Sequence, residues 1–154
     1  MSVQLEGRLA NPARVARRDL CPIERTFKVV GTRSAMLLIR EAAYGTTRFD
    51  DFVRRAGLTE TVASSRLREL VDAGLLSKQP YREPGQRTRH EYLLTAAGAD
   101  LMPTLVALAD WGAEHLPHQA SPSYAHAGCG EAVTAHIECA AGHAITMGEL
   151  VATA

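Results

Sequence analysis

The sequence predicts a mainly α-helical fold with one small β-hairpin, which places the chain in the α+β class. Three observations lead to this prediction. Apolar residues recur every three or four positions through most of residues 22–72, which is the spacing of amphipathic helices. Glycines divide the same stretch into short segments. A Pro-Gly pair at residues 84–85 then joins two strand-like segments.

The first predicted helices lie before residue 45. The pattern predicts a short helix over Pro12–Leu20, because proline suits the first turn of a helix. The next helix is expected to end at Gly31, and the second long one to begin with Ser34 as its N-cap and to end at Gly45. The apolar stripe of the helix before Gly31 consists of Ile23, Phe27 and Val30.

Two further helices follow, with a glycine turn at Gly57 between them. The inward side of the first consists of Phe49, Phe52, Val53 and Ala56. Thr59 is expected to cap the second, with Glu60 favoured near its positive end. The expected buried stripe of this last helix is Ala63, Leu67, Leu70 and Val71. The opposite side carries Thr61, Ser65, Arg68 and Asp72, with Ser64 at the border.

The pattern changes after Gly74. Two strands are predicted on either side of the turn Glu83–Gln86, and Thr95 is then expected to cap a long helix that reaches Leu116. Pro103 should bend this helix unless the helix begins just before it. The apolar stripe of the long helix consists of Leu101, Leu105, Leu108 and Ala109. Beyond Pro117 the chain is expected to be loop-like.

Charge is divided unevenly along a chain whose net charge is zero. Residues 1–95 hold all 17 bases and 11 acids, a balance of +6, and residues 96–154 hold six acids and no base. This division suggests a front half that meets a polyanion, although solvated surface arginines would explain it equally well. No apolar run is long enough to cross a membrane, and no secretory signal is recognised, so three cysteines indicate a reducing cytoplasm.

A short helix, a glycine turn and a second helix form a helix-turn-helix unit, and a hairpin directly after it makes the winged form. A helix with a small polar outer face can enter the major groove of DNA, where Arg68 could reach a guanine. Arg66 could instead pair with Glu69 on the surface. The predicted DNA-binding residues are Thr59, Thr61, Ser64, Ser65, Arg66, Arg68, Lys78, Arg82, Arg87 and Arg89. The alternative is a winged helix that binds only other proteins. No enzyme motif is recognised.

Several motifs of the chain resemble the HxlR-type family of bacterial winged helix-turn-helix regulators. These motifs are CPIERT, RFDDF, SSRLRELVDAGLL, HEYLLTAAG and ADWG. The resemblance covers about residues 21–116, between an N-terminal extension over 1–20 and a Cys/His-containing tail over 117–154. It implies a sequence-specific transcription regulator that is a homodimer formed by terminal helices. We expect this homodimer to bind double-stranded DNA at a pseudo-palindromic operator as a repressor, and to respond to a small ligand or an oxidant.

The sequence departs from the family pattern at two places. The family usually has Gly-Gly-Arg-Trp where this chain has Gly-Thr-Arg-Ser at residues 31–34, so a large aromatic side chain is absent. The family often has Pro and Lys at the positions of Glu60 and Thr61. Because a lysine that would contact phosphate is replaced by threonine, the operator of other members cannot be transferred to this chain.

The cysteines suggest two further sites. Cys21 matches the Cys-Pro of the family, and in some members that cysteine senses oxidants. The alternative is an unreactive cysteine at a helix start.

In the tail, the spacing of two Cys/His pairs resembles a small zinc knuckle. The candidate zinc ligands are His126, Cys129, Cys139 and His143. The alternative is a flexible or hairpin tail in which residues 132–139 pack on the main domain.

Two residues of the long helix, Leu108 and Trp111, are candidates for lining a small-molecule effector cavity. The alternative for Trp111 is packing in the core of the dimer. The sequence itself does not identify a ligand.

Overall fold

The computed structural model describes residues 2–13, 21–117 and 123–153. The predicted helix over Pro12–Leu20 lies mostly outside these residues. In chain order the elements are β1 (Gln4–Leu5), η1 (Gly7–Ala10), α1 (Pro22–Val30), α2 (Arg33–Ala43), α3 (Phe49–Ala56), α4 (Glu60–Asp72), β2 (Leu76–Tyr81), β3 (Arg89–Leu94), α5 (Ala96–Ala99), α6 (Met102–His115), η3 (Met147–Glu149) and β4 (Val151–Ala152). The chain is mainly helical with a small hairpin, as the sequence predicts.

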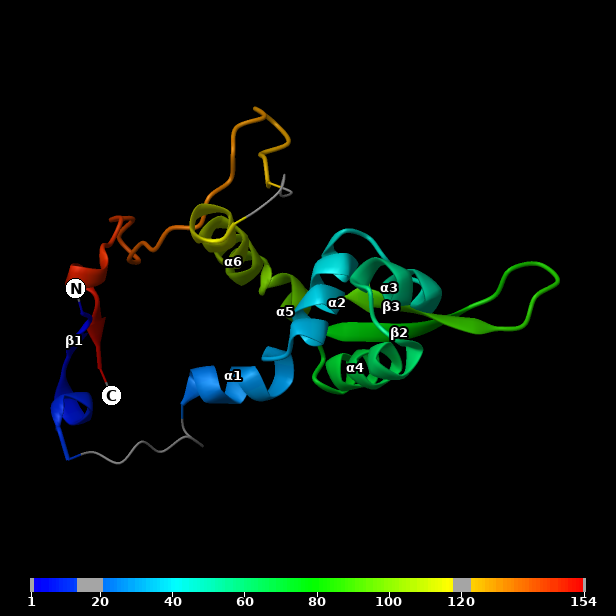
Figure 1. Ribbon diagram of the computed structural model, residues 1–154, viewed down its shortest axis with the longest axis horizontal. Helices are drawn as coiled ribbons and strands as arrows, with labels where there is room; N and C mark the ends of the chain where they lie inside the picture. Colours follow the sequence, from blue (N-terminus) through cyan, green and yellow to red (C-terminus); the bar gives the residue numbers. More distant parts are fainter. Residues whose placement is uncertain (1, 14–20, 118–122, 154) are drawn as a thin grey trace. The chain divides into compact units, whose positions relative to one another are not determined.

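The contacts divide the chain into two compact units, one made of residues 19–105 and the other of residues 1–18 and 106–154. In the unit over 19–105, α2, α3 and α4 pack against one another and against the base of the hairpin, which extends beyond them (Figure 1). The hairpin is antiparallel, with Leu76 opposite Leu94 and Tyr81 opposite Arg89.

The core of this unit is built from the predicted apolar stripes of α3 and α4, together with residues of α2 and β2, whereas Ile23 and Phe27 of the predicted α1 stripe are exposed. Phe52, Leu38, Ile39, Leu67, Leu70 and Leu76 are its largest fully buried side chains. Leu105, at the start of α6, joins the same cluster. The helices therefore bury one side each and leave the other side free for solvent or a ligand.

The structure corrects the predicted cap of α2. Thr32, and not Ser34, occupies the N-cap: its backbone is extended and its hydroxyl accepts a hydrogen bond from the backbone N–H of Ala35 at 3.2 Å. Ser34 already lies in the first turn of the helix. Its own hydroxyl instead lies 3.3 Å from that of Thr32.

The predicted long helix after Thr95 is two helices. Thr95 caps α5 by accepting from the N–H of Gly98, and the chain then turns at Asp100–Leu101 before α6 begins at Met102. Pro103 occupies the second position of α6, where a missing N–H costs no hydrogen bond within the helix. Of the two outcomes expected for Pro103, the structure shows the helix that begins just before it.

The unit formed by residues 1–18 and 106–154 joins the two ends of the chain. Gln4 and Leu5 pair in parallel with Val151 and Ala152, and the backbone N–H of Gln4 donates to the carbonyl of Leu150 at 2.9 Å. No helix of the described residues has the length and apolar character to span a membrane.

Candidate nucleic-acid interface

The turn between α3 and α4 is built by a glycine and a threonine. Gly57 has the left-handed φ of 61°, which disfavours any residue with a side chain, and its backbone ends α3. Thr59 caps α4 by accepting from the N–H of Val62 at 3.4 Å. The chain thus reverses between the two helices at the positions that the sequence predicts.

The two sides of α4 differ sharply in burial. Ala63, Leu67 and Leu70 are buried against the core. Thr61, Ser64 and Arg68 are exposed on the other side. Together with Phe49 from α3, this outer side lines an open depression on the surface. Because the inner side is fixed by packing, the outer side of α4 presents its polar atoms on a rigid element.

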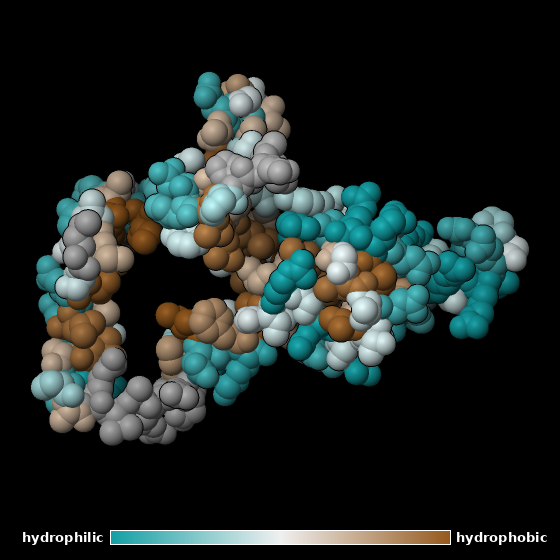
Figure 2. Space-filling model, viewed as in Figure 1, coloured by the Kyte–Doolittle hydropathy of each residue, from teal (hydrophilic) through white to brown (hydrophobic). Residues whose placement is uncertain are grey.

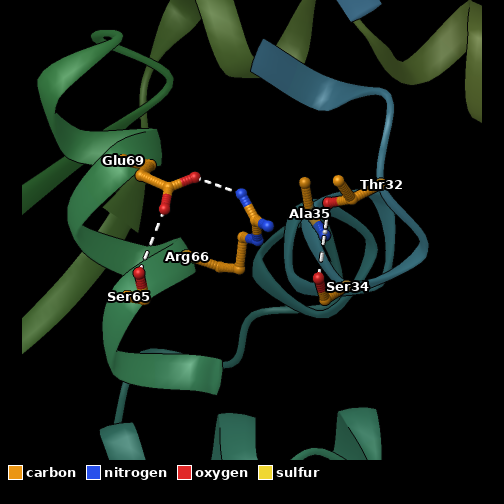
Figure 3. Close-up of polar contacts among 6 residues, drawn as sticks. All are labelled: Thr32, Ser34, Ala35, Ser65, Arg66 and Glu69. Atoms are coloured by element: carbon orange, nitrogen blue, oxygen red, sulfur yellow. Dashed lines mark hydrogen bonds and ion pairs between the residues drawn. The ribbon is translucent and has the colours of Figure 1, made fainter. Parts of the chain in front are cut away.

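Ser65 and Arg66 are engaged with Glu69 on the surface of α4. The Ser65 hydroxyl donates to Oε1 of Glu69 at 3.0 Å, and Nη1 of Arg66 pairs with Oε2 of the same carboxylate (Figure 3). The predicted Arg66–Glu69 ion pair is therefore present. Arg68 forms no ion pair within the described part of the chain, so among the arginines of α4 its guanidinium is the one that is ready to bind a ligand.

The wing carries its cations in the tip loop and on its two strands. The tip is a tight turn in which Gly85 has a φ of 76° and the N–H of Gln86 donates to the carbonyl of Glu83. Arg82 donates from Nε to the carbonyl of Gln86 at 3.0 Å, and Arg87 is exposed beside it. The tip is strongly hydrophilic (Figure 2).

The two cations on the paired strands of the wing, Lys78 in β2 and Arg89 at the start of β3, have intramolecular neighbours. Nζ of Lys78 lies 6.0 Å from the ring centroid of Tyr92, a residue whose phenol pKa is raised by burial. Nη1 of Arg89 lies 4.0 Å from Oδ2 of Asp50 on α3. At that distance the attraction is weak, and both side chains are more than half exposed, so Arg89 can turn to another anion.

Cys21 occupies the N-cap position of α1, and its thiol is exposed. Pro22 begins the helix, and the N–H of Arg25 donates to the carbonyl of Cys21 at 3.0 Å. The exposure that a reactive thiol needs is present. Arg17 and Arg18, which lie close before Cys21 in the sequence, are outside the described residues.

The Cys/His residues of the tail form two separate tight turns. Nδ1 of His126 lies 3.1 Å from Sγ of Cys129, and Sγ of Cys139 lies 3.6 Å from Nδ1 of His143. Among the described residues, no three His, Cys, Asp or Glu side chains gather as the ligands of one metal ion would. The structure thus brings together the members of each predicted pair but does not bring the two pairs together.

The predicted hairpin alternative for the tail is also only partly realised. Ala132 forms an isolated antiparallel bridge with Ala125, residues 133–136 form no strand, and Val133 and Ile137 are exposed. A short hairpin lies later, where Ile145 donates its N–H to Ile137 and Cys139 donates its N–H to His143. Backbone N–H groups of this turn hydrogen-bond to Cys139 and lower the pKa of its thiol.

Leu108 and Trp111 are both more than half exposed on α6, at 54% and 57%. The Trp111 ring packs against His115, with 5.3 Å between the ring centroids. On α1, Ile23 and Phe27 are similarly exposed. Apolar surface on both helices is visible in Figure 2. A large aromatic side chain that is exposed in the single chain is typical of a surface that binds a partner.

One exposed residue of α4 is absent from the sequence prediction. Val62 is 40% exposed and lies between the capped end of the helix and Arg66. The sequence prediction assigned it to neither side of the helix. The only signal available was its angular position on the helix, about 100° from Ala63.

These features define a class. A helix pair with a tight turn, an outward polar face on the second helix and a basic hairpin directly after it form the DNA-binding unit of winged helix-turn-helix regulators. A family model described as HxlR-like helix-turn-helix matches residues 29–120. The chain belongs to this family of transcriptional regulators, and its relatives are regulators and not enzymes.

The relatives support this assignment over most of the chain. An uncharacterized HTH-type transcriptional regulator of Mycobacterium tuberculosis is 40% identical over 119 residues, which cover 76% of this chain and 74% of that protein. A similar regulator of Methanothermobacter thermautotrophicus is 33% identical over 101 residues, which cover 65% of this chain and 76% of that protein.

Solved structures share the fold. The crystal structure of PA1607, which is proposed to be a transcription factor, superimposes with a TM-score of 0.74 at 30% identity and covers 82% of this chain and 89% of that one. The redox regulator HypR in its reduced form has a TM-score of 0.54 at 28% identity and covers 61% of this chain and 92% of that one.

Proposed function

We propose that this protein is a sequence-specific regulator that binds a pseudo-palindromic operator as a homodimer and represses transcription. The observation that carries the proposal is the outer face of α4. Arg68 is free of ion pairs among the described residues and lies beside the exposed hydroxyls of Thr61 and Ser64, on a helix whose other side is buried. A basic wing follows directly.

The chemistry of these groups suits DNA. The guanidinium of Arg68 can donate two parallel hydrogen bonds to O6 and N7 of a guanine in the major groove. Thr61 and Ser64 can bond base edges or phosphates. Arg82 and Arg87 at the wing tip can neutralise backbone phosphates and release counterions.

Dimer formation is proposed from the exposed apolar surface of the terminal helices. Leu108, Trp111 and Leu116 are each more than half exposed at or just after α6, as are Ile23 and Phe27 of α1. A two-fold dimer places two copies of α4 on one DNA duplex, so its operator should have two related half-sites about one helical turn or a multiple apart.

Regulation would act through this dimer. A dimer with two arrangements of its α4 helices would bind DNA in one of them, and a small ligand near Leu108 and Trp111 or an oxidant at Cys21 would shift the balance between the two. Repression follows if the occupied operator overlaps a promoter.

The proposal is tested by selecting bound fragments from sheared DNA of the source genome with purified protein. The expected result is a recovered pseudo-palindromic site, and loss of its enrichment with the Arg68→Ala variant. Sequence-blind binding that responds identically in both proteins would contradict the proposal and favour a protein-binding winged helix.

A further inference from the structure

Arg48 joins the helix-turn-helix to the wing through its backbone. The segment before α3 runs along the edge of β3, where the N–H of Tyr92 donates to the carbonyl of Thr47 at 2.9 Å and Arg48 bridges to Glu91. The carbonyl of Arg48 also accepts from the N–H of Phe52 in α3. One residue therefore belongs both to the sheet and to the first turn of α3.

The side chain of Arg48 crosses the hairpin. Arg48 lies opposite Glu91, and Tyr81 lies opposite Arg89. Because Arg89 and Glu91 are two residues apart on β3, all four side chains share one face of the sheet. Cζ of Arg48 is 3.1 Å from the ring centroid of Tyr81, and its Nη1 is 3.9 Å from Oε2 of Glu91. A planar guanidinium on an aromatic ring is a stacking geometry that lysine cannot reproduce.

This stack lies at the point where the wing leaves the domain. Tyr81 is the last residue of β2, and the tip loop with Arg82 and Arg87 begins immediately after it. Apolar packing of the hairpin ends earlier, where Tyr92 meets Phe52 edge-on with ring centroids 6.2 Å apart. Beyond that pair, polar interactions determine the direction of the tip.

The space between α3 and the wing shows where these interactions act. A polar groove of about 650 Å³ separates them, and Arg48, Asp50, Tyr81 and Arg89 are among the residues that line it. The Arg48–Tyr81 stack and the loose Arg89–Asp50 pair span this groove. Nη1 of Arg48 is buried and finds no hydrogen-bond partner among the described residues, so stacking holds this group in place at the cost of an unsatisfied donor.

We propose that Arg48 is a positioning residue for the wing. By clamping Tyr81 from the start of α3, it sets the angle between the wing tip and α4, and so determines which phosphates Arg82 and Arg87 reach while α4 lies in the major groove. This inference rests on the proposed DNA-binding function. Arg48 acts through the tip cations and does not touch DNA itself.

The first test is a double-mutant comparison in DNA binding, with the operator recovered by fragment selection. Neutralising the tip with Arg82→Ala and Arg87→Ala should lower the slope of log K against log salt by at most about 0.9 for each phosphate that the tip no longer neutralises. Arg48→Ala alone should lower this slope by about the same amount. In a protein that already carries Arg82→Ala and Arg87→Ala, the added Arg48→Ala should weaken DNA binding no further. An equal weakening in both backgrounds would overturn the inference, because Arg48 would then act independently of the tip.

The second test needs no DNA and separates this inference from the proposed function. Amide hydrogen exchange near the ends of β2 and β3 should accelerate in Arg48→Ala, Arg48→Lys and Tyr81→Leu, whereas Tyr81→Phe keeps the ring and should match the wild type. Amides of α4 should exchange unchanged in all of them. Unchanged exchange in the wing, or faster exchange in α4 as well, overturns the positioning role. Absence of any specific operator for the wild type would instead overturn the proposed function.

Discussion

Arg66 and Arg68 are two arginines on one helix turn, yet the structure gives them different neighbours. Arg66 pairs with Glu69, and the same carboxylate accepts the hydroxyl of Ser65. Arg68 is exposed with no such pair in the described chain. An arginine that is paired with a carboxylate must give up that ion pair before it binds a guanine, and an arginine without such a pair gives up nothing. The two arginines should therefore differ in their contribution to DNA binding.

Replacing Arg68 with Ala should weaken operator binding by about 1–3 kcal/mol, because the variant cannot donate the forked pair of hydrogen bonds to a base. Arg66→Ala is the matched control and should cost well under 1 kcal/mol, since it removes an exposed ion pair. Titration of labelled operator at fixed salt measures both. A larger effect for Arg66 than for Arg68 would mean that the Arg66–Glu69 pair opens on DNA.

Cys139 should titrate below the ordinary range for a cysteine. Backbone N–H groups of its turn hydrogen-bond to the sulfur, stabilise the thiolate and lower the pKa of the thiol, so the thiolate fraction at neutral pH rises. Alkylation rates are measured against pH in a variant that carries Cys21→Ser and Cys129→Ser. The pH midpoint of the rate should lie below that of an ordinary cysteine and should move to higher pH in denaturant. An identical midpoint in denaturant would contradict the hydrogen-bonded turn.

At the scale of elements, most of the helix-turn-helix could be predicted from sequence. The stripe around Leu67, the cap at Thr59 and the turns at Gly57 and Gly85 all lie where spacing and residue type indicate. These features are local, because a few neighbouring residues determine them. The choice of Thr32 over Ser34 as a cap was not predictable, because both hydroxyls suit the role and only the backbone geometry decides between them.

Pairing between distant segments was the least predictable feature. β1 and β4 are two residues each and lie at opposite ends of the chain, so no periodicity marks them. The stacking of Arg48 on Tyr81 likewise requires the strand register. In sequence, Arg48 is only a polar residue before a helix, and the prediction therefore missed it as part of the candidate site.

The turn at Gly57 should be sensitive to any added side chain. Gly57→Ala places a Cβ at a φ of 61°, where no atom clashes but the backbone conformation itself is unfavourable. Thermal or urea unfolding should show a destabilisation of about 1–2 kcal/mol. Gly57→Asn is the control and should be destabilised less, because asparagine tolerates this conformation better. Equal stability of all three proteins would contradict the left-handed turn.

The wing should act through charge and not through base reading. Neutralising Arg82 and Arg87 together should lower the slope of log K against log salt by about 0.9 for each phosphate that is no longer neutralised. The base preference at the operator should remain, because α4 is untouched. A changed base preference with an unchanged slope would show that the tip reads bases in a groove.

At the scale of the whole molecule, the exposed apolar surface of α6 is expected to lie within a dimer. Trp111→Glu should convert dimer to monomer, since it places a charge in an apolar interface, and sedimentation should show the halved mass. Ile137→Glu is the control, because Ile137 is 55% exposed but lies outside α6. A dimer that survives Trp111→Glu and Leu108→Glu would place the interface elsewhere.

We propose above that α4 recognises DNA sequence through Arg68. The most direct measurement is the affinity of wild-type protein and the Arg68→Ala variant for a set of operators, each with one base pair of a half-site changed. We expect the wild-type protein to lose about 1–3 kcal/mol of binding free energy when one guanine is changed. The variant should no longer distinguish bases at that position while it keeps the other preferences. Identical preference profiles for the two proteins would contradict it.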